Sequence, residues 1–312
     1  MFFGFVWRSS RKLLSSFTSF ESPLKTVRPM KSLLYASALA GACLLSAWSG
    51  VAAQSVKLTK SWESDTTLTT PESVLYDAKA NVLYVSCING GPAPENSKSF
   101  IAKVSPDGKI IKRNFTENLT STKGMAIFGN KLYVTEILKL VEIDLKTGKV
   151  LKKYDVPEAK FLNDIAIDAK GKVYFTDMRS NRIWVLNNGK IEKVAEEGQL
   201  KNPNGLLYEN GKLLVGNGDG KLLAYDLKTK QFTTFAEGMG GLDGIAADGK
   251  KGYFVSEWQG KIWHIGADGK PELLLDSVTQ KTNTADLDYN IAKKMLYVPT
   301  FFVNKVMAYS VE

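Results

Sequence analysis

Cysteine and histidine are almost absent from this sequence. Its 312 residues contain two cysteines, Cys43 and Cys87, and a single histidine, His264. Because Cys43 falls in a segment that we expect to be removed, the mature chain would keep one thiol and could form no internal disulfide. The low count also excludes metal clusters built from cysteine. The position of His264 inside the strand-like run Trp263-His264-Ile265 argues against a Ser-His-Asp triad.

A basic surface is also missing, although the formal net charge is +9. Residues 1–53 hold six Lys or Arg and one acidic residue, Glu21, and the remainder carries 35 basic and 31 acidic residues, a net of +4. No cluster of Lys and Arg is interleaved with aromatic residues. The charge therefore reflects targeting, and we expect no nucleic-acid partner.

The N-terminal region resembles a targeting segment. After Met30 and Lys31, the uncharged run from Leu33 to Trp48 has 16 residues, fewer than the roughly 20 that a membrane span needs. Small residues at 51–53 resemble a cleavage site before Gln54. We expect residues 30–53 to be a signal peptide and residues 1–29 an extension or a misassigned start. The mature protein would be periplasmic or secreted, without stable membrane insertion; an uncleaved anchor is the alternative.

The chain also lacks any helical periodicity that lasts three turns, and it repeats itself instead. Equivalent positions fall at intervals of 51, 40, 41, 39 and 42 residues, at Glu72, Lys123, Asn163, Asn204, Asp243 and Ala285. Each unit has a short apolar strand, a turn, a β-branched or aromatic strand, a third strand and usually a fourth. Four strands in about 40 residues, repeated six times, predict an all-β, six-bladed β-propeller.

The sixth unit stops after VMAYSV and lacks its fourth strand. The segment Val56 to Trp62 alternates as a strand does, and we predict that it pairs in the last blade and closes the ring. Residues 54–312 would then form a single domain. Two stacked sandwich domains are the alternative, against which the even spacing argues.

Oxygen-bearing side chains recur at one position of the repeat. Because the first strand of each propeller blade lines the central channel, Glu72, Asn163, Asn204 and Asp243 should meet at one of its mouths. Oxygen donors without cysteine or histidine suit a hard cation such as calcium. The competing interpretation is structural, because Asn-Gly and Asp-Gly are ordinary turn formers.

These motifs resemble those of the regucalcin, gluconolactonase and luciferin-regenerating enzyme family of six-bladed propellers with a central divalent cation. The matching features are Glu72 five residues before Asp77, Asn163-Asp164, Asn204-Gly205 and Asp243-Gly244. The resemblance implies that Glu72, Asn204 and Asp243 bind the metal. It also implies that Asn163 approaches metal and substrate together.

The main departure from the family pattern is at position 161. Catalytic members often have an Arg two residues before the third-blade Asn, where it contacts a sugar-acid substrate, and this chain has Phe161. An aldonolactone substrate is therefore in doubt. Further candidates for substrate contact are Asp164 and four residues near the ends of second strands, namely Glu136, Asp177, Asn217 and Glu257.

A cation in such a funnel can polarise a carbonyl and lower the pKa of bound water. The sequence therefore predicts an exported, calcium-dependent hydrolase of the lactonase or esterase type that acts on a small cyclic ester. Asp243 would serve as ligand and base, and Asn163 would orient the carbonyl. The alternative is a non-catalytic propeller that binds a protein partner and uses its metal structurally, because fold alone does not decide function.

Overall fold

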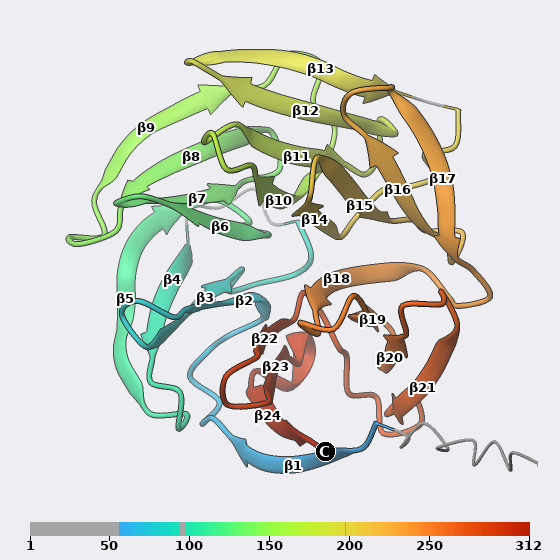
Figure 1. Cartoon of the computed structure of the whole chain (residues 1–312). Coiled ribbons are helices and arrows are strands. Elements are labelled where there is room, and N and C mark those ends of the chain that lie inside the picture. Colours follow the sequence, from blue (N-terminus) through green and yellow to red (C-terminus); the bar gives the residue numbers. More distant parts are fainter. Residues whose placement is uncertain (1–55, 94–97, 197) are drawn as a thin grey trace, which may run out of the picture. The chain divides into compact units, whose positions relative to one another are not determined.

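The computed structural model describes residues 56–93, 98–196 and 198–312, so the predictions for residues 1–53 lie outside the described residues. The described residues belong to one compact unit. Its strands build six four-stranded antiparallel sheets around a common centre (Figure 1). The predicted six-bladed β-propeller is confirmed.

Five blades are simple meanders in which neighbours along the chain pair with one another, and the sixth takes its outer strand from β1 (Leu58–Glu63). The first blade contains β2 (Pro71–Asp77), β3 (Val82–Cys87), β4 (Ser99–Val104) and β5 (Ile110–Leu119). The second contains β6 (Met125–Phe128), β7 (Lys131–Thr135), β8 (Lys139–Asp144) and β9 (Val150–Asp155). The third contains β10 (Leu162–Ile167), β11 (Val173–Asp177), β12 (Arg182–Asn187) and β13 (Lys190–Glu196). The fourth blade contains β14 (Leu206–Glu209), β15 (Lys212–Gly216), β16 (Leu222–Asp226) and β17 (Gln231–Ala236). The fifth contains β18 (Leu242–Ala247), β19 (Tyr253–Glu257), β20 (Lys261–Ile265) and β21 (Pro271–Asp276). The sixth contains β22 (Asp288–Asn290), β23 (Met295–Pro299), β24 (Val306–Val311) and β1.

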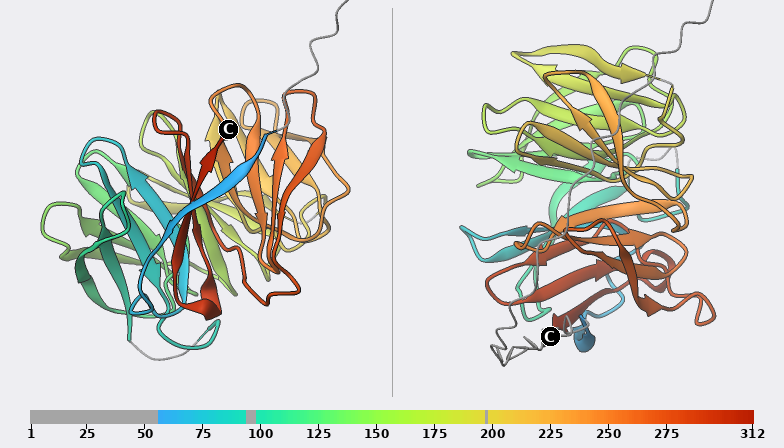
Figure 2. Two further views of the ribbon diagram at one scale, coloured as in Figure 1. Left: turned by 90° about the horizontal axis from the view of Figure 1, so that it is seen from below. Right: turned by 45° about the vertical axis from the view of Figure 1, so that its right-hand side comes forward.

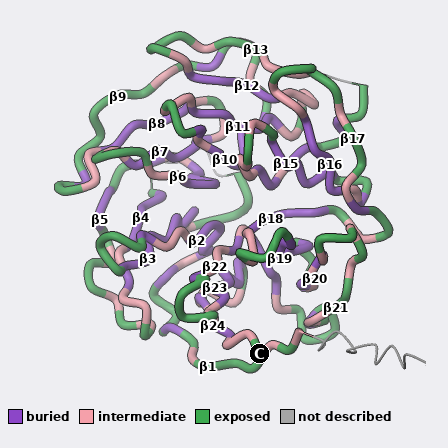
Figure 3. The backbone as a smooth tube through the Cα atoms, viewed as in Figure 1, coloured by how far each residue is buried: buried purple, intermediate pink, exposed green. Residues whose placement is uncertain are grey.

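Burial falls from the centre of the ring outward, as Figure 3 shows. The innermost strands contact one another in the order β2, β6, β10, β14, β18 and β22, and β22 returns to β2. The second strands are rich in Val, Leu, Tyr and Phe and are almost wholly buried, because both of their faces pack against neighbouring blades. The fourth strands, such as β9, are mostly exposed. The core is therefore divided into apolar layers between blades.

The ring closes through the N-terminal strand. β1 pairs antiparallel with β24, from Leu58 opposite Val311 to Glu63 opposite Met307, and so completes the sixth blade (Figure 1). The ring of Trp62 lies 6.0 Å from that of Tyr297, and its indole N–H donates to the carbonyl of Pro106. The predicted closure is confirmed.

Figure 2 shows the blades from the side, with their strands running between the two ends of the ring. We call the end at which the innermost strands begin the upper mouth. Connections from second to third strands and between blades lie at this end. The described residues contain no helix that is long and apolar enough to span a membrane. They include one short 3₁₀ helix, η1 (Phe301–Val303), between β23 and β24.

Candidate metal and substrate site

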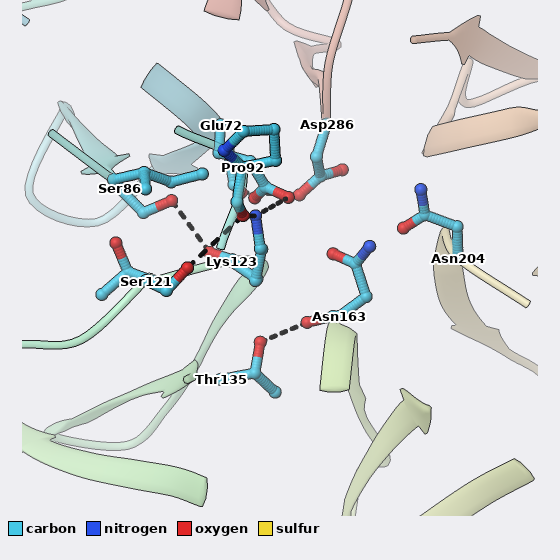
Figure 4. Close-up of polar contacts among 12 residues, drawn as sticks. Glu72, Ser86, Pro92, Ser121, Lys123, Thr135, Asn163, Asn204 and Asp286 are labelled. Carbon is cyan, nitrogen blue, oxygen red and sulfur yellow. Dashed lines mark hydrogen bonds and ion pairs between the residues drawn. The ribbon is translucent and has the colours of Figure 1, made fainter. Parts of the chain in front are cut away.

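The residues that begin the innermost strands gather at the upper mouth. Figure 4 shows Glu72, Lys123, Asn163 and Asn204 pointing from four different blades toward a common space. Glu72, Asn163 and Asp243 are 3–6 % exposed, and Asn204 is partly exposed. The fold therefore brings together the four oxygen-bearing residues that the sequence singled out.

Hydroxyl groups on the second strands hold this ring in position. In four blades, a Ser or Thr at one repeat position donates to the backbone carbonyl of the mouth residue in the next blade: Ser86 to Lys123 (2.8 Å), Thr135 to Asn163, Thr176 to Asn204 (2.8 Å) and Ser256 to Ala285 (2.8 Å). These bonds join each blade to its neighbour. They fix the backbone from which the site side chains project.

The glycines of the Asn-Gly and Asp-Gly pairs are needed for space. A Cβ on Gly205 would lie 1.8 Å from the carbonyl oxygen of Asp243, and one on Gly244 would lie 2.4 Å from the amide nitrogen of Leu287. Neither glycine has a positive φ. The pairs therefore let neighbouring innermost strands approach closely, and the simple turn interpretation does not describe them.

A buried ion pair lies at the mouth. The Lys123 ammonium is 3.7 Å from Oε1 of Glu72 and donates to the carbonyl of Pro92 at 2.9 Å. It also lies 5.5 Å from the ring of Phe161 and 5.9 Å from that of Phe301. Burial lowers the pKa of Lys123, against the attraction of Glu72 and Asp243, and burial raises the pKa of Glu72.

Two oxygen atoms at the mouth have no partner. Glu72 Oε2 and Asn204 Oδ1 are buried and make no hydrogen bond within the described part of the chain. The amide of Asn204 donates instead to Asp243 Oδ1 at 3.1 Å, so its own oxygen faces away from that bond. Buried acceptors without partners are costly, and native proteins normally satisfy them. The chemistry of these two oxygens fits that of cation ligands.

Further carboxyl groups lie just below this ring. A cavity of about 250 Å³ lies among the innermost strands and is lined by Asp164, Asp286 and Asp288, together with apolar residues from all six blades. Burial raises the pKa of Asp164 to about 7 and that of Asp288 to about 6. Burial together with neighbouring carboxyl groups raises the pKa of Asp243 and Asp286 well above its ordinary value.

The charge balance of the channel favours a bound cation. Glu72, Asp164, Asp243 and Asp286 interact with one another electrostatically, and the Lys123 ammonium offsets Glu72 and Asp243. No group of three acidic, histidine or cysteine side chains in residues 56–93, 98–196 and 198–312 is arranged to hold a metal by itself. The fitting set is therefore mixed, with two carboxylates and one amide oxygen, as Glu72, Asn204 and Asp243 provide.

The four residues near the ends of second strands hold the backbone of adjacent loops. Each accepts an N–H from the segment that enters the first strand of its own blade: Glu136 from Thr120 (2.8 Å), Asp177 from Phe161 (2.9 Å), Asn217 from Lys201 (3.2 Å) and Glu257 from Gly240 (2.6 Å). All four are buried. Glu136 also lines a pocket of about 520 Å³ at the upper mouth.

Asp164 and Phe161 have different surroundings. Asp164 accepts the N–H groups of Leu206 (2.6 Å) and Ile165 (2.7 Å), so it links blades three and four below the mouth. Phe161 lines the 520 Å³ pocket, and the guanidinium of Arg179 lies 4.7 Å from its ring. A positive charge therefore lies beside Phe161, although it comes from the β11–β12 connection.

Sequence reasoning did not select Lys123, Asp286 or Arg179. Lys123 was visible at the repeat position but offers no oxygen. Asp286 could have been found one residue further on, where the six units read Ser73, Gly124, Asp164, Gly205, Gly244 and Asp286. The Asp164 and Asp286 side chains occupy the space beside Gly124 and Gly244. Arg179 lies outside the repeat pattern and left no such signal.

One protein-family model matches most of the chain. Residues 70–285 match the SMP-30/gluconolactonase/LRE-like region. The chain belongs to this family. No curated protein matches the chain significantly. The family relationship supports a lactonase-type hydrolase that acts on a small molecule, and family members usually depend on a metal.

Several solved structures share the fold of this chain at low sequence identity. Virginiamycin B lyase from Staphylococcus aureus, in a catalytically inactive form with quinupristin, has a TM-score of 0.59 and 15% identity, with 82% of this chain and 99% of that chain covered. A streptogramin B lyase has a TM-score of 0.59 and 12% identity, covering 83% and 98%. A chain of a nidogen/laminin complex has a TM-score of 0.58 and 15% identity, covering 69% and 87%. These similarities concern the fold alone.

Proposed function

We propose that this protein is a divalent-cation-dependent hydrolase, with calcium as the cation, that opens a small cyclic ester at the upper mouth. The observation that carries the proposal is the pair of buried, unpartnered oxygens on Glu72 and Asn204 beside Asp243. Carboxylate and amide oxygens are calcium's usual ligands. When bound, such a cation would polarise the ester carbonyl and acidify a water molecule.

The chain's own residues would position the reactants and move the proton. Asn163 presents an amide that can donate to the carbonyl oxygen of the ester. Asp243 Oδ1 is engaged by Asn204, which leaves Oδ2 to accept a proton from water. Burial and the neighbouring Glu72 and Asp164 carboxyl groups raise the pKa of Asp243, which makes it a stronger base than an exposed aspartate. Lys123 holds one oxygen of Glu72 and leaves the other directed away.

The decisive experiment is a calcium titration combined with a lactone panel on the chain that begins at Gln54. We expect turnover of at least one lactone, its loss with chelator, and its recovery with calcium. Asn204→Ala should weaken calcium binding, and Asp243→Asn should abolish turnover while the protein stays folded. Turnover that persists in chelator, or in Asp243→Asn, would refute the proposal.

A non-catalytic binding propeller is the second candidate. It is favoured by the side chains of Trp258 and Phe302, which are 37 % and 53 % exposed and pack edge-on with a ring separation of 5.9 Å. Exposed aromatic residues are typical of interaction surfaces. Tight calcium binding without turnover of any lactone, ester or phosphotriester would favour this candidate.

Export is part of the proposal and rests on the sequence of residues 30–53. Expression in a host with a secretion pathway should yield a mature protein whose first residue is Gln54, as N-terminal sequencing would show. A membrane-bound product that retains Met30 would favour the uncleaved anchor.

A further inference from the structure

A second cavity opens beside the ring at the upper mouth. It has a volume of about 520 Å³ and lies between blades two and three, with Ile137, Leu138, Phe161 and Arg179 in its wall. Phe161 is shared with the central site, because its ring is 5.5 Å from the Lys123 ammonium. A ligand at the mouth could therefore extend directly into this pocket.

Part of the pocket wall is apolar. The side chain of Leu138 is 51 % exposed, and the neighbouring Ile137 and the ring of Phe161 also line the cavity. An apolar surface left open inside a concave site gains free energy when a ligand covers it. The wall therefore suits an alkyl or aryl arm.

The pocket also carries one positive charge without a compensating carboxylate. Lys153 pairs with Glu136 at 2.8 Å, and Lys139 pairs with Asp155 at 2.9 Å. Arg179 makes no ion pair within the described residues, and its guanidinium is stacked 4.7 Å from the Phe161 ring. Stacking restrains the guanidinium while its N–H groups stay available to an anion.

From this combination we propose that the pocket is a subsite for an apolar arm that ends in a carboxylate. Arg179 binds the carboxylate through paired N–H groups, and Leu138 and Phe161 cover the arm. The substrate class would then be a lactone or ester with an anionic tail. This statement about the substrate rests on the proposed function, whereas the binding of the carboxylate does not.

Binding is tested first, on calcium-free protein, by calorimetry with 4-phenylbutanoate and its neutral amide. The parent should bind the carboxylate at least about tenfold more tightly than the amide, because hydrogen bonds to a charged group are strong. Arg179→Gln should remove this preference, and Arg179→Lys should retain part of it. Leu138→Ser should weaken the binding of both probes. A preference that survives in Arg179→Gln, or equal binding of the two probes by the parent, would overturn the proposal.

The matched control is Arg113→Gln. Arg113 is another arginine stacked on a phenylalanine, 4.0 Å from the ring of Phe100, on a different blade. This variant should keep the parent's preference.

Turnover is tested second, with a γ-lactone that bears a four-carbon carboxyalkyl arm and a neutral γ-lactone with an alkyl arm of equal length. The ratio of kcat/KM should favour the acid about tenfold in the parent and approach one in Arg179→Gln. Carboxylate binding without turnover of either lactone would count against the hydrolase and leave the subsite standing. Preferred turnover of the neutral lactone by the parent would overturn the subsite.

Discussion

The Lys123 ammonium lies 3.7 Å from the Glu72 carboxylate, and both side chains are almost fully removed from solvent. Lys123 comes from the second blade and Glu72 from the first, so the pair joins two blades at the upper mouth. It neutralises only part of the negative charge there, since Asp243 also lies within electrostatic range. A cation held by Glu72 would share that carboxylate with Lys123.

Replacement of Lys123 by Met should therefore have two effects. Without calcium, it leaves Glu72 buried and unpaired, and the free energy of unfolding should fall by about 3–5 kcal/mol. Calcium should then stabilise the variant more than the parent, because it no longer competes with an ammonium. Thermal unfolding in chelator and in calcium measures both quantities.

The control for this prediction is Lys109→Met, which removes an exposed pair with Asp107 and should leave the free energy of unfolding close to that of the parent. A Lys123→Met protein with the parent's response to calcium would show that Glu72 is not shared.

The hydroxyl of Thr176 should contribute both to the stability of the fold and to calcium binding. It donates to the Asn204 carbonyl at 2.8 Å and accepts the N–H of Asp164 at 3.0 Å. Thr176→Val keeps the volume but leaves the buried N–H of Asp164 and the half-buried carbonyl of Asn204 without this partner, so the free energy of unfolding in urea should fall by about 2–3 kcal/mol. Calcium affinity should also fall, because Asn204 loses its restraint. Thr176→Ser should restore both properties, and Thr234→Val on the exposed face of β17 should change neither. Normal stability in Thr176→Val would contradict this role.

The sequence predicted the fold because a propeller repeats one local pattern, and that pattern survives in the apolar strands of every unit. It also located Glu72, Asn163, Asn204 and Asp243, since circular symmetry converts one repeat position into one place in space. The contact between Arg179 and Phe161 could not be predicted in this way. It joins a connection to a strand start, and no period encodes it.

The residues near the ends of second strands illustrate the same limit. Asp177 follows the repeat and its location was predicted, but its oxygens accept the N–H groups of Lys160 and Phe161. Which polar side chain at a mouth binds backbone and which faces the channel depends on loop conformation, which sequence spacing does not contain.

Asp288 should make stability depend on pH. Its pKa rises from 3.8 to about 6, because burial outweighs the N–H donors of Tyr76 and Tyr289. The folded state therefore holds the proton more tightly than the unfolded state, and the free energy of unfolding falls as pH rises from about 4 to 6. At about 1.4 kcal/mol per pKa unit, the loss is up to about 3 kcal/mol.

Asp288→Asn removes this titration. The free energy of unfolding of the variant, relative to that of the parent, should therefore rise as the pH rises from 4 to 6. Urea unfolding in chelator at pH 4, 5, 6 and 7 measures the difference. Glu272→Gln, on the exposed face of β21, is the control and should follow the parent at every pH. If the difference in free energy of unfolding between Asp288→Asn and the parent is the same at every pH, the prediction is refuted.

Removal of β1 should weaken the cation site as well as the fold. A chain that begins at Asp65 lacks the strand that covers β24 and the packing of Trp62 on Tyr297. We expect this chain to unfold at a lower temperature than one that begins at Gln54, or to aggregate through its open edge. A synthetic peptide of residues 54–64 should restore the lost stability by pairing with β24, and a Trp62→Ala peptide should restore less.

Removal of β1 should also lower the affinity for calcium, because the contact between the last and first blades lies beside Glu72. The N–H of Asp286 donates to the Glu72 carbonyl at 3.0 Å, and the Ser73 hydroxyl donates to the Asp286 carboxylate at 2.6 Å. If the sixth blade loosens without its outer strand, the backbone of Glu72 loses this support. Calcium affinity should then fall in the chain that begins at Asp65 and recover with the peptide. Unchanged affinity in a shortened chain that remains folded would show that closure of the ring and assembly of the site are independent.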